Sequence, residues 1–261
     1  MKNVIKKIAG IVAGKSFSQS FFELLYKAGL FGMNIGGSSN LKVNGEINVL
    51  HYIKSRLNYP PVVFDVGANV GAYIEALRKV FDEIEIHAFE PLQANFSQLK
   101  DKFNDDSKVK LIRKGIGDKK TQTTIYFNPE LGSMASVYQR QLAHHHFEIN
   151  TSETIELDTL DNYTAENKIE KIDFLKLDIE GHELAALQGA KNLLSEKKVR
   201  FIQFEFGGTN IDSKTYFRDF WYLLSPQYKI YRIVKDGLKE IKFYNENNEI
   251  FGYVNYLAEL R

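Results

Sequence analysis

The stretch VFDVGANVGAY, residues 63–73, places two glycines directly after a short apolar run. The run VVFDV at 62–66 is apolar enough for a strand covered on both faces, as the strands of parallel sheets are. Gly67 suits a tight turn, and Gly71 suits close packing or close approach of a ligand. With a helix predicted over 70–80, the stretch reads as strand, turn and helix. Sheets built from such units bind ligands beyond the carboxyl ends of their strands.

Strand and helix patterns alternate through the rest of the chain. We predict a helix from 45 to 57, and a short strand pair at 121–127 and 153–160 that forms a hairpin-like excursion. The pattern predicts an α/β fold with right-handed crossovers, helices on both faces of a mostly parallel sheet, and an antiparallel edge near the end of the chain. Further strands are expected at 83–89, 108–114, 172–179, 199–206, 228–234 and 249–260, and further helices at 92–103, 183–194 and 215–224.

The N-terminal region differs in charge from the rest of the chain. Residues 1–60 carry eight Lys or Arg and two Asp or Glu, hence +6, in a chain whose formal net charge is +1. The apolar spacing predicts an amphipathic helix over residues 1–13 and a second, buried helix over 17–31. We therefore divide the chain into an N-terminal helical extension, 1–44, and one domain, 45–261. Two roles for the extension stay open. It packs on the protein's own body or on a second subunit of a homodimer, or residues 1–31 make a peripheral membrane contact.

Composition excludes several classes of protein. The chain has no cysteine, which rules out a disulfide scaffold and thiolate metal sites and fits a reducing compartment. No segment reaches the roughly 18 consecutive apolar residues of a membrane span. The small net charge gives no sign of a nucleic-acid-binding surface. We therefore expect a cytoplasmic protein, peripheral at the inner face of the membrane if its N-terminal helices bind lipid, with no nucleic-acid partner.

The glycine turn favours a ligand without phosphate. Asn69 stands where a dinucleotide site has the glycine that lets a pyrophosphate approach the backbone. Asp65 would repel a pyrophosphate and suits a cation such as S-adenosylmethionine, which carries an ammonium and a sulfonium. Glu90, which ends the strand at 83–89, can accept hydrogen bonds from ribose hydroxyls. NAD-binding proteins use an acid at that place too, so an NAD-dependent oxidoreductase is the alternative, with a non-catalytic binding module as a further one.

A second acidic segment, LKLDIEGHE at 175–183, ends another buried strand. A carboxylate at the mouth of a central strand, as at Asp178, is costly unless it binds something. Asp178, Glu180 and His182 are the candidate catalytic residues, because a hydroxyl nucleophile needs a general base. Glu205 ends the following strand. Magnesium held by Asp178 and Glu205 is conceivable from their oxygen ligands, but we predict no metal site.

Taken in order, the segments VFDVGANVGAY, AFEP, IELDTLDNY and IDFLKLDIEGHELAALQGA resemble the FkbM family of S-adenosylmethionine-dependent methyltransferases. The likeness extends over residues 45–257 and leaves residues 1–44 outside. It implies the class I methyltransferase (Rossmann-like) fold, with a seven-stranded, mostly parallel sheet whose last strand is antiparallel. It also implies transfer of a methyl group to a hydroxyl of a sugar, glycan or natural product.

The same resemblance assigns the site residues. The segment GSMASV at 132–137 matches a serine-containing loop of the family. Asp178, Glu180 and Glu205 would face the substrate, whereas Glu90 would bind the ribose of the cofactor. The methionine end of S-adenosylmethionine would be held by Asp65, Gly67, Asn69 and Gly71, and its adenine would lie against Gly115, Ile116, Gly117 and Asp118.

Overall fold

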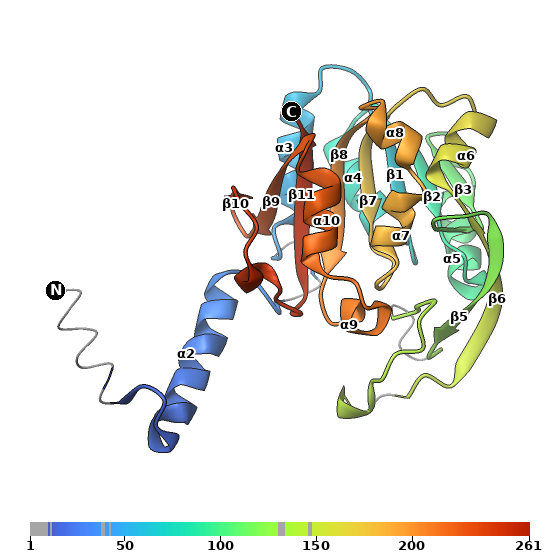
Figure 1. The fold of residues 1–261 in the computed structure, drawn as a ribbon. Coiled ribbons are helices and arrows are strands. Elements are labelled where there is room, and N and C mark those ends of the chain that lie inside the picture. Colours follow the sequence, from blue (N-terminus) through green and yellow to red (C-terminus); the bar gives the residue numbers. More distant parts are fainter. Residues whose placement is uncertain (1–9, 11, 38–39, 42, 130–133, 146–147) are drawn as a thin grey trace.

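The structure is a computed structural model that describes residues 10, 12–37, 40–41, 43–129, 134–145 and 148–261. Most of the helix predicted over 1–13, and Gly132 and Ser133 of the predicted loop, lie outside the described residues. An eight-stranded sheet forms the centre of the domain (Figure 1). Its strands, in spatial order, are β10 (Gly237–Ile241), β9 (Tyr228–Val234), β11 (Val254–Leu260), β8 (Val199–Phe206), β7 (Ile172–Leu177), β1 (Val62–Val66), β2 (Glu85–Phe89) and β3 (Val109–Ile112).

The order of the strands sets where a ligand can bind. From β1 the chain first builds outward through β2 to β3, and later continues from β7 on the other side of β1. The topological switch point therefore lies between β1 and β7, where the carboxyl ends of both strands diverge into their following loops. The α/β class I fold is confirmed, and β11 is the expected antiparallel strand, paired with β8 and β9.

The predicted count of seven strands is wrong by one. β10 forms an antiparallel hairpin with β9 across the turn at Lys235 and Asp236. Its sequence, GLKEI, buries none of its residues fully, so the alternation that marks a half-buried strand is weak there. The hairpin extends the sheet beyond the seven strands that the resemblance implies.

Helices cover both faces of the sheet. On one face α3 (Glu46–Arg56), α4 (Ala72–Val80) and α5 (Gln93–Phe103) pack their apolar sides on alternate residues of β1 and β7, such as Val63 and Phe174. On the other face lie α6 (Leu160–Glu166), α7 (Glu183–Gln188), α8 (Lys191–Ser195) and α10 (Phe217–Leu224). The sheet is thus buried on both sides, and the loops at its carboxyl edge are left to form a site.

A three-stranded sheet lies beside the main one, in the order β4 (Gly115–Ile116), β6 (Thr151–Asp158), β5 (Thr121–Phe127). β5 and β6 pair antiparallel along their length, which confirms the predicted excursion. The chain between them includes the short helix η2 (Ala143–His145), and α9 (Thr209–Ser213) and η3 (Glu246–Asn248) complete the described helices.

The helix predicted as buried over 17–31 is present but exposed. After η1 (Ser16–Ser18), α2 (Gln19–Gly32) has no buried residue, and Figure 1 shows it extending away from the domain. Leu30, near the end of the helix, packs against the core, and the segment after the helix is fixed to the body, where Ile35 is buried and the N–H of Gly36 donates to the carbonyl of Tyr253 at 2.8 Å. Within the described part of the chain, no helix is long and apolar enough to cross a membrane.

Candidate active site

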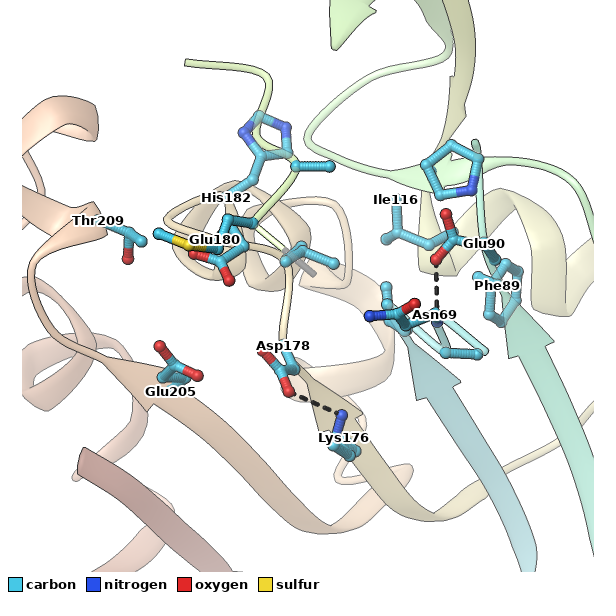
Figure 2. Close-up of a pocket in the computed structure, with 18 of the residues that line it drawn as sticks. Asn69, Phe89, Glu90, Ile116, Lys176, Asp178, Glu180, His182, Glu205 and Thr209 are labelled. Atoms are coloured by element: carbon cyan, nitrogen blue, oxygen red, sulfur yellow. Dashed lines mark hydrogen bonds and ion pairs between the residues drawn. The ribbon is translucent and has the colours of Figure 1, made fainter. Parts of the chain in front are cut away.

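A cavity of about 740 Å³ opens at the switch point of the sheet, within the usual size range of small-molecule sites. Figure 2 shows Asn69, Phe89, Glu90 and Ile116 on one side of it, and Asp178, Glu180 and Glu205 on the other. Of the residues predicted from sequence, the lining includes Gly67, Asn69, Glu90, Gly115, Ile116, Asp178, Glu180, His182 and Glu205, but not Asp65, Gly71, Gly117 or Asp118.

Steric crowding requires both glycines of the first turn. Gly67 has φ +88°, and a Cβ there would lie 1.9 Å from the carbonyl oxygen of Asp178. Gly71 also has φ +88°, and its Cβ would lie 2.3 Å from the ring of Phe103 on α5. Gly67 therefore lets the loops after β1 and β7 meet, whereas Gly71 serves helix packing behind the cavity.

Hydrogen bonds within the protein occupy most backbone donors of this turn. The N–H groups of Gly67 and Ala68 both donate to the carbonyl of Phe89 at 3.0 Å, and that of Gly71 donates to Ala68 at 2.8 Å. Asn69, at φ +49°, donates its N–H to Oε2 of Glu90 at 2.9 Å. The turn is therefore not a cradle of free N–H groups of the kind that binds phosphate.

Glu90 is held at the end of β2 with both carboxylate oxygens hydrogen-bonded. Besides Asn69, the N–H of Leu92 donates to Oε1 at 3.0 Å, and the amide of Asn95 approaches the same oxygen at 3.4 Å. Only 4% of Glu90 is exposed. Burial raises its pKa from 4.5 to about 7, although these hydrogen bonds oppose the shift. The carboxylate can still accept hydrogen bonds from hydroxyls in the cavity.

A row of polar residues crosses the buried sheet beneath the cavity. Asp65 of β1, Lys176 of β7 and Gln203 of β8 are register partners, so their side chains point to the same face. Nζ of Lys176 lies 3.4 Å from Asp65 and 3.1 Å from Asp178, and 4.7 Å above the ring centre of Tyr73. Asp65, fully buried, does not line the cavity itself but holds Lys176, which does.

The charge of Lys176 is stabilised by three carboxylates. Burial would lower its pKa, but Asp178, Asp65 and Glu46 together raise it above the ordinary lysine value. Glu46, at the start of α3, is buried, and Gln203 donates to it at 2.6 Å. Sequence reasoning missed Lys176 and Glu46. The signal for Lys176 was a lysine two positions before Asp178, in a strand whose other residues are apolar except for Asp173.

Three carboxyl groups line the acidic side of the cavity. Lys176 holds one oxygen of Asp178, while 39% of that side chain stays exposed. Burial, together with the neighbouring Asp178 and Glu180, raises the pKa of Glu205 well above its ordinary value. Burial and Asp178 raise the pKa of Glu180 to about 8, against the opposing charge of Arg140. Glu180 and Glu205 therefore hold their protons more tightly than exposed glutamates do.

Glu180 is positioned by the loop between β7 and α7. It has φ +52°, and its Oε2 accepts from Nη1 of Arg140 at 2.9 Å. Glu183 closes the loop, because its Oε1 accepts the N–H groups of Ile179 at 2.9 Å and Gly181 at 3.2 Å. Ser136, in the predicted serine-containing loop, donates to the carbonyl of Glu180 at 2.7 Å. Arg140 was not predicted, since its partner lies 40 residues further along the chain.

His182 lies at the edge of the cavity, next to the predicted adenine segment. Its Nδ1 lies 3.0 Å from the hydroxyl of Tyr138. Its Nε2 is buried without a hydrogen-bond partner among the described residues, and a Cβ on Gly117 would lie 2.9 Å from it. Burial lowers its pKa, so the ring is neutral at neutral pH. Asp118 is exposed and stays outside the lining.

Nothing in the described residues forms a group of three or more His, Asp or Glu side chains placed to hold a metal ion. The acidic side of the cavity offers Glu205 from β8 and Asp178 and Glu180 from the loop after β7, and their nearest cations are the side chains of Arg140 and Lys176. The acidic side of the cavity can accept hydrogen bonds and transfer protons.

The chain is similar to several known proteins. The chain is 25% identical over 177 residues to 2-O-methyltransferase NoeI of Sinorhizobium fredii, a match that covers 63% of this chain and 71% of that protein. Two solved structures are distantly similar. A Streptococcus mutans protein in complex with SAH has a TM-score of 0.44 at 11% identity, covering 82% of this chain and 97% of that one. A precorrin-6Y methyltransferase of Geobacter metallireducens has a TM-score of 0.41 at 11% identity, covering 86% and 93%.

The family assignment depends on a different match. The model of the methyltransferase FkbM domain matches residues 65–233, which is well over half of the chain. The matched segment begins at Asp65 in β1 and includes Glu90, Lys176 and Asp178, so it contains most of the site described above. The chain therefore belongs to the methyltransferase FkbM domain family.

Proposed function

We propose that this protein transfers a methyl group from S-adenosylmethionine to a hydroxyl of a sugar or glycan. The observation that carries the proposal is that the N–H groups of Gly67, Ala68 and Asn69 are occupied within the protein. A pyrophosphate would find carboxylates and few free donors at this turn, which argues against the NAD-dependent alternative. A cationic, phosphate-free ligand fits the same surface.

The residues present fit S-adenosylmethionine. Glu90 presents a buried carboxylate at the end of β2. At this position Rossmann-like folds place an acid that accepts hydrogen bonds from the ribose hydroxyls. Asn69 and Gly67 line the same side, and Phe89 and Ile116 add apolar surface for a planar base. When bound, S-adenosylmethionine supplies a methyl carbon already activated by its sulfonium. The carboxylates across the cavity favour that positive charge by electrostatic attraction.

The acidic side then orients the acceptor and receives its proton. Lys176 fixes Asp178 from below, which leaves the carboxylate able to accept a hydrogen bond from an acceptor hydroxyl. Asp178 and Glu180 are the proposed proton acceptors, and neutral His182 lies close enough to the cavity to assist. Good alignment of the reacting groups can account for roughly 7–11 kcal/mol of the barrier.

The charge on this side also restricts the acceptor. The carboxyl groups of Asp178, Glu180 and Glu205 give a phosphate or carboxylate no cation to pair with, and any of them that ionises would repel it, so the acceptor group is a neutral hydroxyl. Thr209 and Tyr253 line the same cavity and can hydrogen-bond to further hydroxyls. The relative NoeI is named as a 2-O-methyltransferase, which supports oxygen as the methylated atom.

Calorimetric titration with S-adenosylmethionine, S-adenosylhomocysteine and NAD in parallel tests the cofactor. We expect both adenosyl ligands to bind and NAD not to bind. Glu90→Gln should weaken adenosyl binding at least tenfold, whereas Glu240→Gln, an exposed control on β10, should not. Binding of NAD alone would overturn the proposal.

Transfer of a labelled methyl group to a panel of neutral saccharides tests the reaction. Asp178→Asn should lower turnover while S-adenosylhomocysteine affinity is nearly preserved. If the protein binds the cofactor but methylates no hydroxyl acceptor, the non-catalytic binding module becomes the better description.

A further inference from the structure

An exposed apolar helix is the largest feature that the active site does not explain. Five large apolar side chains of α2 are each at least 50% exposed, namely Phe21, Leu24, Leu25, Tyr26 and Phe31. In Figure 1 the helix extends away from the domain with no other labelled element alongside it. Apolar surface of this extent on one side of a molecule marks a site of interaction.

The pattern of α2 is that of a helix lying at an interface. Phe21, Leu24, Leu25 and Ala28 fall at i, i+3, i+4 and i+7, which places them on one face. The polar residues gather in a narrow stripe on the opposite side, formed by Gln19, Ser20, Glu23 and Lys27. At 14 residues the helix is about 21 Å long, too short to span a bilayer. A wide apolar face with a narrow polar stripe suits immersion in the plane of a lipid surface.

Charge selects lipid over a second copy of the chain. Residues 1–44 contain six lysines and one glutamate, a net charge of +5. Two such segments packed together would repel each other, whereas an anionic membrane surface would attract each of them. Lys15 and Lys27, both exposed, stand on either side of Phe21 in the sequence. We propose that α2 docks this protein on anionic lipid surfaces.

Docking through α2 would bring the cavity near the membrane. The N–H of Gly36, four residues after the helix ends, donates to the carbonyl of Tyr253, a residue of the cavity lining. Leu41, in the same connection, also lines the cavity. The docking surface therefore joins the body of the protein at the rim of the site. This inference does not depend on the methyl donor or the acceptor.

Co-sedimentation of the full-length protein with vesicles tests the proposal. Vesicles of phosphatidylcholine alone are compared with vesicles that also contain phosphatidylglycerol. We expect binding to the anionic vesicles, weaker binding to the neutral ones, and release by salt. Leu24→Gln/Leu25→Gln should weaken binding at least tenfold, and Lys15→Gln/Lys27→Gln by roughly fivefold for each lysine removed.

The matched control is Gln19→Ala/Ser20→Ala on the polar stripe, which should bind vesicles as the wild type does. Thermal melting of every variant checks that the domain is folded. Equal sedimentation with and without anionic vesicles would overturn the proposal. So would a dimer in analytical ultracentrifugation that Leu24→Gln/Leu25→Gln dissociates, because a second copy would then cover the helix.

Discussion

Glu90 is expected to make the empty protein less stable as pH rises, and Glu90→Gln should remove this effect. Glutamine has nearly the same shape as a protonated glutamate but cannot ionise. In the wild type, burial raises the pKa of Glu90 from 4.5 to about 7. The folded state therefore holds the proton more tightly than the unfolded chain. The stability contributed by that proton is fully present below pH 4.5 and is lost as pH rises through about 7.

The size of the effect follows from the same pKa. A tenfold change in an equilibrium constant corresponds to about 1.4 kcal/mol, so ionisation of Glu90 in the folded state costs about 3 kcal/mol. At about pH 5 the variant should be less stable by about 1–3 kcal/mol, because the amide nitrogen of glutamine cannot accept one of the two backbone N–H bonds that Glu90 accepts. Between about pH 5 and pH 8.5 the variant should gain about 3 kcal/mol relative to the wild type. Single domains have 5–15 kcal/mol in total, so the difference is measurable.

Urea unfolding of both proteins across this pH range measures the difference directly. Other carboxyl groups with raised pKa, such as Glu183 and Glu180, contribute to both curves and cancel in the comparison. Parallel stability curves for the variant and the wild type across this range would refute the reasoning. S-adenosylhomocysteine binding should weaken in the same variant, which would show that the buried carboxyl group of Glu90 also contributes to ligand binding.

Three further predictions concern other residues at and around the cavity. Lys176→Met leaves Asp65 buried without its counter-ion and should cost about 3–5 kcal/mol in urea unfolding at neutral pH. This loss of stability should become smaller in acid, because Asp65 then takes up a proton. A loss of stability that is the same at every pH would contradict the ion pair. Gly67→Ala puts a Cβ 1.9 Å from a main-chain oxygen and should prevent stable folding, while Gly237→Ala, with nothing within 4 Å, should be tolerated in thermal melting. If deprotonated Glu180 takes part in turnover, the rate should rise as pH passes about 8 and Glu180→Gln should lose that rise; equal pH profiles would remove Glu180 from the reaction.

The local sequence was sufficient to predict features that depend on backbone sterics and on the spacing of apolar residues. The turn after β1 was predicted because Gly67 and Gly71 follow an apolar run, and Glu90 because an acid ends the next strand. The pairing of Lys176 with Asp65 could not be predicted in this way, since the two are 111 residues apart and meet only through the register of β1 and β7. Asp65 was therefore assigned to the ligand, whereas in the structure it contacts Lys176, which lines the cavity in its place.

Two helices show where apolar patterns mislead. The segment 183–194 reads as one helix, but it divides into α7 and α8 around Gly189, where a Cβ would lie 2.0 Å from the carbonyl oxygen of Gly117. The apolar content of α2 predicted burial, yet burial requires a surface to pack on, and composition does not say whether the chain supplies one. The first helix is divided at a contact with Gly117, which is distant in the sequence, whereas most of α2 has no such contact to bury it.

The two sides of the cavity come from different stretches of the chain. Asn69 and Glu90 precede the small sheet and Ile116 lies in its first strand, β4, whereas Asp178 and Glu205 follow it. Under the proposed function, donor recognition is encoded in the first half of the domain and acceptor recognition in the second. Loops that carry function tolerate exchange when the scaffold beneath them is rigid. New acceptors could thus be acquired by swapping downstream loops between relatives, with the methyl-donor site inherited unaltered.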